Sequence, residues 1–213
     1  MEHSPKHYNF SFTAGAALLQ ETVTIAQTLL ETNFDWDKTK QEINNNNLLQ
    51  KDKRQTSTRQ FSLVKFRLEQ LSKQQIKMLC SESMPDKKIM VILSIIKSHP
   101  LVFDFIAETI RSKYFAFDYK LTYADYNAFI NEKQAEHPEL NSITEGTGKK
   151  IRQMVFKILE QTELIDSVKS GTIKKPYVSP QLEQVIVKDN PFLLAALLYN
   201  NEEIILATQK HHA

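Results

Sequence analysis

The residues of this chain best suited to chemistry are its cations, which gather in three short stretches. Between Lys51 and Lys73 the chain holds seven lysines and arginines against two acids, whereas the net charge of the whole chain is only +2. An anionic partner responds to the local potential and not to the sum of all charges. The first stretch therefore predicts phosphate contacts, for which we select Lys51, Lys53, Arg54 and Arg59.

Two arginines of this stretch also have a structural interpretation. Phe61, Val64 and Leu68 are spaced three and four residues apart, which predicts the buried stripe of a helix. Arg59 and Arg67 fall on the shoulders of that apolar surface. An arginine in such a place can hold the fold through an ion pair, so this role competes with nucleic-acid binding for both residues.

The second basic stretch follows Gly146 and Gly148, where apolar residues from Ile151 to Ile165 recur at helical spacing. The outward arc of this predicted helix carries Lys149, Lys150, Arg152, Gln153 and Lys157. A recognition helix needs cations at its N-terminal end for phosphates, and amide or guanidinium groups for base edges. A solvated helix face without any function has a similar composition, so both interpretations stand.

The third basic stretch lies within residues 168–178 and contains Lys174 and Lys175. Its sequence predicts a β-ribbon that turns at Ser170 and Gly171. Placed after a recognition helix, such a ribbon would be a wing. We expect its two lysines to contact phosphates as well.

Motifs of catalysis and of metal binding are absent from the sequence. It has no glycine-rich phosphate loop, no HExxH and no pair of CxxC units. Cys80 follows Met78 and Leu79 on a predicted helix, which favours a buried, inert thiol over a nucleophile. The acids form no recognisable pair for general acid and base catalysis, and two terminal histidines are too few for a structural metal site. We expect no enzyme, no cofactor and no metal.

The elements that position these cations divide the chain into two predicted domains. Residues 1–118 form an N-terminal helical bundle, in which the segment 86–99 has little polar surface and marks the centre of the core. The expected helices cover 13–31, 35–44, 56–71, 73–81, 86–99 and 100–114. Asp35 is the expected N-cap of the second of them.

Residues 119–213 predict a winged helix-turn-helix-like domain with a small β-ribbon, so the fold class is mainly α. Ser142 and Glu145 have the spacing of a capping box, and the long basic helix would be capped near Thr147. Further helices would start at Ser179-Pro180 and at Asn190-Pro191, with proline in the first turn. The last residues would be a frayed tail.

The composition favours a soluble, cytoplasmic protein. Hydrophobic residues make up 41% of the chain, enough for a core, and the single cysteine fits a reducing compartment. The first ten residues have no uninterrupted apolar segment, which excludes a signal peptide. The longest apolar run, 191–199, is about half the roughly 20 residues that a membrane span needs. We therefore expect no membrane partner.

Two groups of short motifs resemble the BrxA family of BREX (bacteriophage exclusion) phage-defence systems. The first group comprises NNLLQ at 46–50, TR at 58–59 and RLxxL at 67–71. The second comprises EGT at 145–147, KxIR at 149–152, IL at 158–159 and LI at 164–165. Asp35-Trp36 and a leucine-rich first helix are similar too, so the resemblance spans nearly the whole chain.

The resemblance implies a cytoplasmic, non-catalytic, mainly helical component of an antiviral defence system. It further implies nucleic-acid binding and a likeness to NusB, the antitermination factor. Two hypotheses follow. The protein binds double-stranded DNA through phosphates with a weak sequence preference, or it is an adaptor that docks other BREX proteins. RNA binding of the NusB kind is a variant of the first hypothesis.

Overall fold

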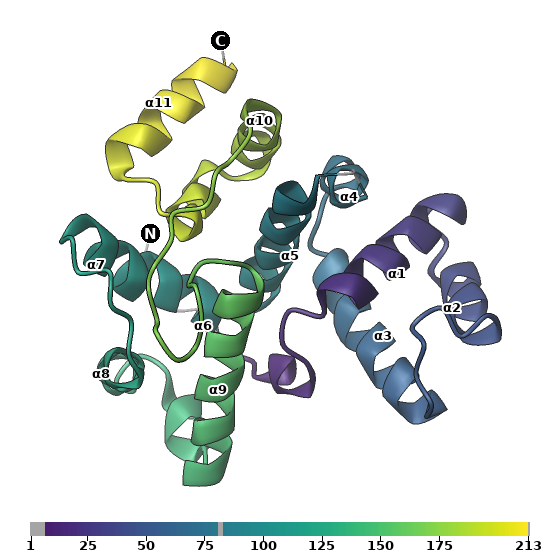
Figure 1. Cartoon of the computed structure of the whole chain (residues 1–213), viewed down its shortest axis with the longest axis horizontal. Coiled ribbons are helices and arrows are strands. Elements are labelled where there is room, and N and C mark those ends of the chain that lie inside the picture. The colour runs from purple at the N-terminus through teal and green to yellow at the C-terminus, as the bar shows by residue number, and fades with distance from the viewer. Residues whose placement is uncertain (1–6, 81–82, 213) are drawn as a thin grey trace.

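The computed structural model describes residues 7–80 and 83–212, and the regular elements in these ranges are all helices (Figure 1). The α-helices are α1 (Leu19–Glu31), α2 (Trp36–Asn45), α3 (Arg54–Leu68), α4 (Lys73–Leu79), α5 (Met84–Ser98), α6 (Pro100–Asp104), α7 (Arg111–Phe115), α8 (Tyr123–Lys133), α9 (Glu145–Gln161), α10 (Pro180–Asp189) and α11 (Asn201–His212). Short 3-10 helices are η1 (Ser11–Ala14), η3 (Pro138–Ser142) and η4 (Pro191–Leu197), and η2 (Phe105–Ile110) is a π-helical turn. The prediction of a mainly α fold is confirmed.

Helix α5 lies at the centre of the molecule (Figure 1). Its residues from Ile89 to Ile96 are all buried, on every face of the helix. A helix that is apolar all round must be covered all round, and α1, α3, α4 and α6 pack against it. The segment predicted as the centre of the core is therefore its centre.

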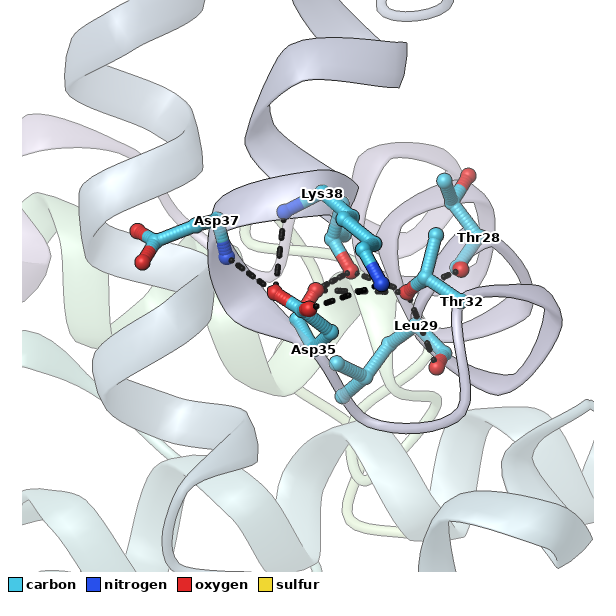
Figure 2. A network of polar contacts seen from close by, with 7 residues as sticks. Thr28, Leu29, Thr32, Asp35, Asp37 and Lys38 are labelled. Carbon is cyan, nitrogen blue, oxygen red and sulfur yellow. Dashed lines mark hydrogen bonds and ion pairs between the residues drawn. The ribbon is translucent and has the colours of Figure 1, made fainter.

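The start of α2 shows how local sequence sets a helix boundary (Figure 2). The Asp35 carboxylate accepts hydrogen bonds from the backbone N–H groups of Asp37 and Lys38, both at 3.0 Å. These bonds satisfy two of the amides that a helix start leaves unpaired, and they lower the pKa of Asp35, the Lys38 N–H having the largest effect. The Thr32 hydroxyl contacts the Thr39 hydroxyl at 2.6 Å and joins α1 to α2. The predicted N-cap is confirmed.

Three predicted helix starts are corrected by the structure. The first helix is interrupted, because Leu18 adopts a left-handed φ of 51° and α1 begins only at Leu19. Helix α3 begins at Arg54 and not at the hydroxyl residues 56–58. Helix α9 begins at Glu145, where the Thr144 hydroxyl accepts from the Thr147 N–H at 3.3 Å. Thr144 is therefore the N-cap of α9, in place of Thr147, and the predicted capping box of Ser142 and Glu145 is not formed.

Residues 100–115 form one helix that widens into a π-helical turn at its middle. Within residues 7–80 and 83–212, no single helix has the length and apolarity to cross a membrane. Only Met84–Ser98 and Pro100–Phe115 meet those criteria, and only when counted together across a bend of 117°.

The predicted β-ribbon is absent from the described residues, which contain no strand, and no winged helix is formed by them. Residues 166–178 make two isolated bridges instead, Ile165 with Ile173 and Lys120 with Thr172. The reason is that other groups take the hydrogen bonds of a ribbon. The Asp166 carboxylate accepts from the backbone N–H groups of Ser167 and Thr172, and the Gly171 carbonyl accepts from Leu121.

The C-terminal segment is more ordered than the sequence predicted. The segment that starts at Asn190-Pro191 is the short η4, and residues 209–212, which were expected to be a frayed tail, are the last residues of α11. The His211 imidazole contacts the Glu183 carboxylate of α10 at 2.9 Å. This contact joins the two ends of an α10–η4–α11 unit at the top of Figure 1.

One segment near the N-terminus, Tyr8–Ala17, crosses the molecule and is called the arm below. The Tyr8 side chain stacks on His137 at 3.6 Å between ring centroids, and its hydroxyl donates to Asp104. At the other end of the arm, the Ala17 N–H donates to the Gln161 side chain at 2.9 Å. Buried apolar residues of both predicted domains form one continuous cluster. The boundary between 118 and 119 stays a prediction.

Candidate nucleic-acid interface

The cations at the start of α3 differ in how free they are. Lys53 is the N-cap residue of α3, Arg54 is its first residue, and both are exposed without an acidic partner among the described residues. Lys51, by contrast, lies only 2.8 Å from the Glu21 carboxylate of α1, and its side chain is 26% exposed. The start of α3 therefore offers two cations that are free among the described residues, whereas Lys51 joins the segment before α3 to α1.

The two arginines with competing interpretations are separated by the structure. Arg59 is exposed on α3 beside Phe66 and lines a shallow hollow with Asn9 of the arm. Arg67 is fully buried and donates to the backbone carbonyls of the arm. Arg67 is therefore a structural residue whose partners are carbonyls, and Arg59 remains available to a ligand.

The predicted contact residues on α9 differ in whether their side chains already have a partner. Lys150 and Gln153 are exposed, and neither has a side-chain partner among the described residues. Lys149 pairs with Glu145 at 2.6 Å, and Lys157 pairs with Glu160. Both pairs join neighbouring side chains near the surface of one helix, and surface ion pairs of this kind contribute little to stability. A phosphate can displace such a carboxylate at small cost.

Arg152 is committed to the contact between α8 and α9. Its guanidinium lies over the Tyr123 ring at 4.4 Å from the centroid, and its Nη1 donates to the Asn127 side chain at 2.8 Å. Its Nε is buried and has no partner among the described groups. The residue that the sequence assigned to base edges therefore lies beside α8, at the wall of a cavity.

This cavity of about 390 Å³ lies between α8, η3 and the first turns of α9, with Phe10 of the arm beside it. Asn127 and Asn131 of α8 and Gln134, the C-cap residue of α8, line one side of it. Their spacing of four and three residues places three amides on one helix face. The spacing was visible in the sequence, but the sequence did not show that this face meets α9, so these residues were missed.

Lys174 and Lys175 are not part of the same surface as the start of α9. The Lys174 N–H donates to the Leu164 carbonyl just beyond the C-terminal end of α9. Lys150 lies eleven residues before the end of α9, about 17 Å along the helix axis, which separates it from these lysines. Lys175 pairs with Glu203 at 2.7 Å and lies over the Tyr199 ring, whereas Lys174 is exposed. The predicted phosphate contacts therefore do not form one surface: Lys174 and Lys175 lie beyond one end of α9, and Lys150 lies near the other end.

The starts of α3 and α9 lie toward the same side of the molecule. Helix η1 of the arm packs between the two helices, and both begin toward the lower edge of the view in Figure 1. Backbone N–H groups at a helix start carry a partial positive charge and attract anions. Lys53, Arg54, Arg59 and Lys150 are the exposed predicted contacts near these two helix starts. Within the described residues, no three His, Cys, Asp or Glu side chains could hold a metal ion.

Fold and surface together define a mainly helical protein with one continuous core and basic helix starts. The family model of BrxA matches residues 6–190, and the chain therefore belongs to the BrxA family.

Two relatives agree with this assignment, and one solved structure shares the fold. The chain is 24% identical over 172 residues to the BREX protein BrxA of Escherichia coli O9:H4 (strain HS), covering 81% of this chain and 80% of that protein. It is 29% identical over 93 residues to the BREX protein BrxA of Bacillus cereus (strain H3081.97), covering 43% and 46%. The crystal structure of an uncharacterized protein from Magnetospirillum magneticum superposes with a TM-score of 0.79 at 22% identity, over 90% of this chain and 98% of that one, and shows the same fold.

Proposed function

We propose that the protein is a non-catalytic, cytoplasmic component of a BREX phage-defence system that binds double-stranded DNA through phosphates. The observation that carries the proposal is the pair of helix starts at one side of the molecule. There Lys53, Arg54 and Lys150 are exposed and have no acidic partner among the described residues.

The mechanism follows from charge and helix geometry. Each phosphate neutralised by a cation releases counterions from the nucleic acid, which drives binding at low salt. Cations without internal partners contribute at once, whereas Lys51 and Lys175 would first have to leave Glu21 and Glu203. In the manner of a recognition helix, α9 would direct Gln153 toward base edges. One amide reads little sequence, so the preference among sequences is weak.

Charge reversal on the two helix starts tests the proposal. The double substitution Arg54→Glu with Lys150→Glu should weaken duplex binding at least tenfold for all sequences alike. It should also reduce the slope of log affinity against log salt by roughly 2, about one for each phosphate contact. Fluorescence anisotropy with a labelled duplex at several salt concentrations measures both.

The matched control is the double substitution Lys77→Glu with Lys188→Glu. These lysines are exposed on α4 and α10, away from the helix starts, and the change in net charge is the same. If both doubles weaken binding equally, net charge and not this face governs binding. That result would contradict the assignment of the interface.

A second candidate function is an adaptor that docks other BREX proteins. Large apolar side chains favour it, because Phe117 is 80% exposed and Tyr177 is 76% exposed, with Phe192 and Leu206 also exposed. Tyr177 and Leu206 line one shallow hollow, and contiguous apolar surface marks protein interaction sites. An adaptor would fail to bind duplex at physiological salt and would co-purify with its partner proteins. Competition between duplex DNA and RNA separates the RNA variant from the first proposal.

A further inference from the structure

The cavity between α8 and the start of α9 has a composition that phosphate binding does not use. Its lining includes the apolar side chains of Phe10, Tyr126, Ile130, Leu140, Ile143 and Ile151. Polar side chains line it as well: the amides of Asn127, Asn131 and Gln134 on the α8 side, and Thr144, Glu145, Lys149 and Arg152 on the α9 side. Apolar side chains together with convergent polar groups are typical of a small-molecule site.

The amides are available to a ligand. Asn131 and Gln134 make no side-chain hydrogen bond within residues 7–80 and 83–212. Asn127 accepts from Arg152 through its oxygen, which leaves its NH₂ group to donate. The cavity therefore offers donors and acceptors beside apolar side chains, without a net charge on the amide side. This combination suits a flat heteroaromatic ring with polar edges, and amides of Asn and Gln are the side chains that bind adenine edges bidentately.

The mouth of the cavity favours a group that is attached to an anion. Lys149 lies on the lining with its side chain 60% exposed, and its ion pair with Glu145 is a solvent-exposed one. The first N–H groups of α9 lie beside it and carry the positive end of the helix dipole. A nucleotide has both groups, a ring that could enter the cavity and a phosphate that could lie at its mouth.

We propose that this cavity binds an unpaired nucleobase of a nucleic-acid strand, with Lys149 and the start of α9 holding the adjoining phosphate. The inference rests on the proposed function and adds to it a preference for bulged, mismatched or single-stranded sites. A paired base cannot enter, because its hydrogen-bonding edge and its faces are occupied within the duplex. An unpaired base enters without the unpairing cost.

Gly148 allows a sharp test, because it lines the cavity from α9. A Cβ added there would meet only Ile143 Cγ2, at 3.9 Å, so Gly148→Leu fills the cavity without a clash in the backbone. Gly146, two residues earlier on α9, is exposed, has nothing within 4 Å of its Cβ position and does not line the cavity. Gly146→Leu is the matched control, since both changes replace a helical glycine with a better helix former.

The experiment compares a labelled, fully paired duplex with the same duplex containing one extra adenine. The protein should bind the bulged duplex about tenfold more tightly, since stacking and reading one base contributes on that order. Gly148→Leu should abolish this preference, measured as the ratio of the affinities for the two duplexes. Gly146→Leu should keep that ratio. Circular dichroism checks that α9 is intact in each variant.

The outcomes separate this inference from the proposed function. Equal affinity of the unchanged protein for both duplexes overturns the nucleobase site and leaves DNA binding in place. Loss of the preference in both glycine variants also overturns it, because the start of α9 and not the cavity would then be responsible. If the unchanged protein binds neither duplex, the proposed function is wrong and the nucleobase site with it.

Discussion

Arg67 is the residue whose environment departs most from what its type suggests. Its Nη1 donates to the carbonyl of Ala16 at 2.8 Å and its Nη2 donates to that of Gly15 at 3.0 Å, deep inside the protein. Burial lowers its pKa to about 9. The guanidinium fixes the turn of the arm just before Leu18, so a residue of the RLxxL motif serves the fold and not a ligand.

His99 is buried beside Arg67 and makes the stability of the protein depend on pH. Its Nδ1 lies 2.6 Å from the Asn9 side-chain oxygen, and its Nε2 is buried without a partner among the described groups. Burial, with a smaller effect of the Arg67 charge, lowers the pKa of His99 from 6.5 to about 3. Below pH 6.5 the unfolded chain therefore binds a proton that the folded protein does not.

We expect the free energy of unfolding to fall by about 1.4 kcal/mol per pH unit below pH 6.5 from this residue alone. Well above pH 6.5 the protonation of His99 does not change the free energy of unfolding, which then declines from pH 6.5 toward pH 3. Between pH 7 and pH 5 the difference is about 2 kcal/mol, and His99→Gln should remove it. Urea unfolding at a series of pH values measures the change.

Above pH 7.5 the free energy of unfolding should depend on pH in the same way for the variant and the original protein, which is the internal control. If His99→Gln keeps the same fall between pH 7 and pH 5, another group takes up the proton.

At this scale the sequence predicts what is local. The N-cap Asp35 was predicted because such a cap bonds amides two or three residues ahead of it, and the structure has these bonds. The helix start at Ser179-Pro180 was predicted from proline in the first turn, and Ser179 caps α10 there. The partners of Arg67 lie about 50 residues away, so no short-range pattern identifies them. The same sequence pattern therefore allowed an ion pair for Arg67 that the fold replaces with backbone carbonyls.

Among the elements, the segment 166–178 depends on Gly171. This glycine adopts a left-handed φ of +64°, and a Cβ built on it would lie 2.1 Å from the Leu121 carbonyl oxygen. The close approach exists because the Leu121 N–H donates to the Gly171 carbonyl at 2.8 Å. Both the torsion and the contact therefore exclude a side chain.

Gly171→Ala should lower the free energy of unfolding by more than about 1 kcal/mol, since the residue must either clash or leave its conformation. Thermal or denaturant unfolding measures the loss. Gly146→Ala on α9 is the matched control and should leave stability unchanged or slightly higher, because that position is open and helical. A Gly171→Ala protein as stable as the original would show that the loop rearranges freely.

The elements also show where sequence patterns were insufficient. The turn at Ser170-Gly171 was recognised correctly as a turn, since Gly171 has the positive φ that turns require. What the pattern could not reveal is that the Asp166 carboxylate and the segment at Leu121 compete for the same backbone groups. The spacing of the amides on α8 likewise indicates one helix face, but the sequence does not indicate that this face lies against α9.

For the whole molecule, the main question is whether its two halves unfold together. Trp36 on α2 is the only tryptophan, so its fluorescence reports the N-terminal half. Leu159 on α9 is fully buried in the other half. Leu159→Ala should cost about 2–5 kcal/mol, as other buried leucines do. Because one apolar cluster runs through both halves, we expect the unfolding midpoint seen by Trp36 to fall together with that seen by circular dichroism.

Gln153→Ala is the control on the same helix, since its side chain is exposed and should change stability by less than about 0.5 kcal/mol. A Trp36 midpoint that stays fixed while the circular dichroism signal shifts would show independent halves. The predicted boundary between 118 and 119 would then be a true domain boundary.

The arm sets the order in which the molecule can be completed. Its backbone at Tyr8 and Ala17 is bonded to Glu139 and Gln161, partners more than 130 residues away in the chain. During synthesis the arm is made before its partners, because Glu139 and Gln161 follow Tyr8 and Ala17 by 131 and 144 residues. Contacts of such long range slow folding relative to local helix pairing. The arm can therefore reach its place only after α9 has been made, and until then the sides of α3 and α9 that η1 contacts are uncovered.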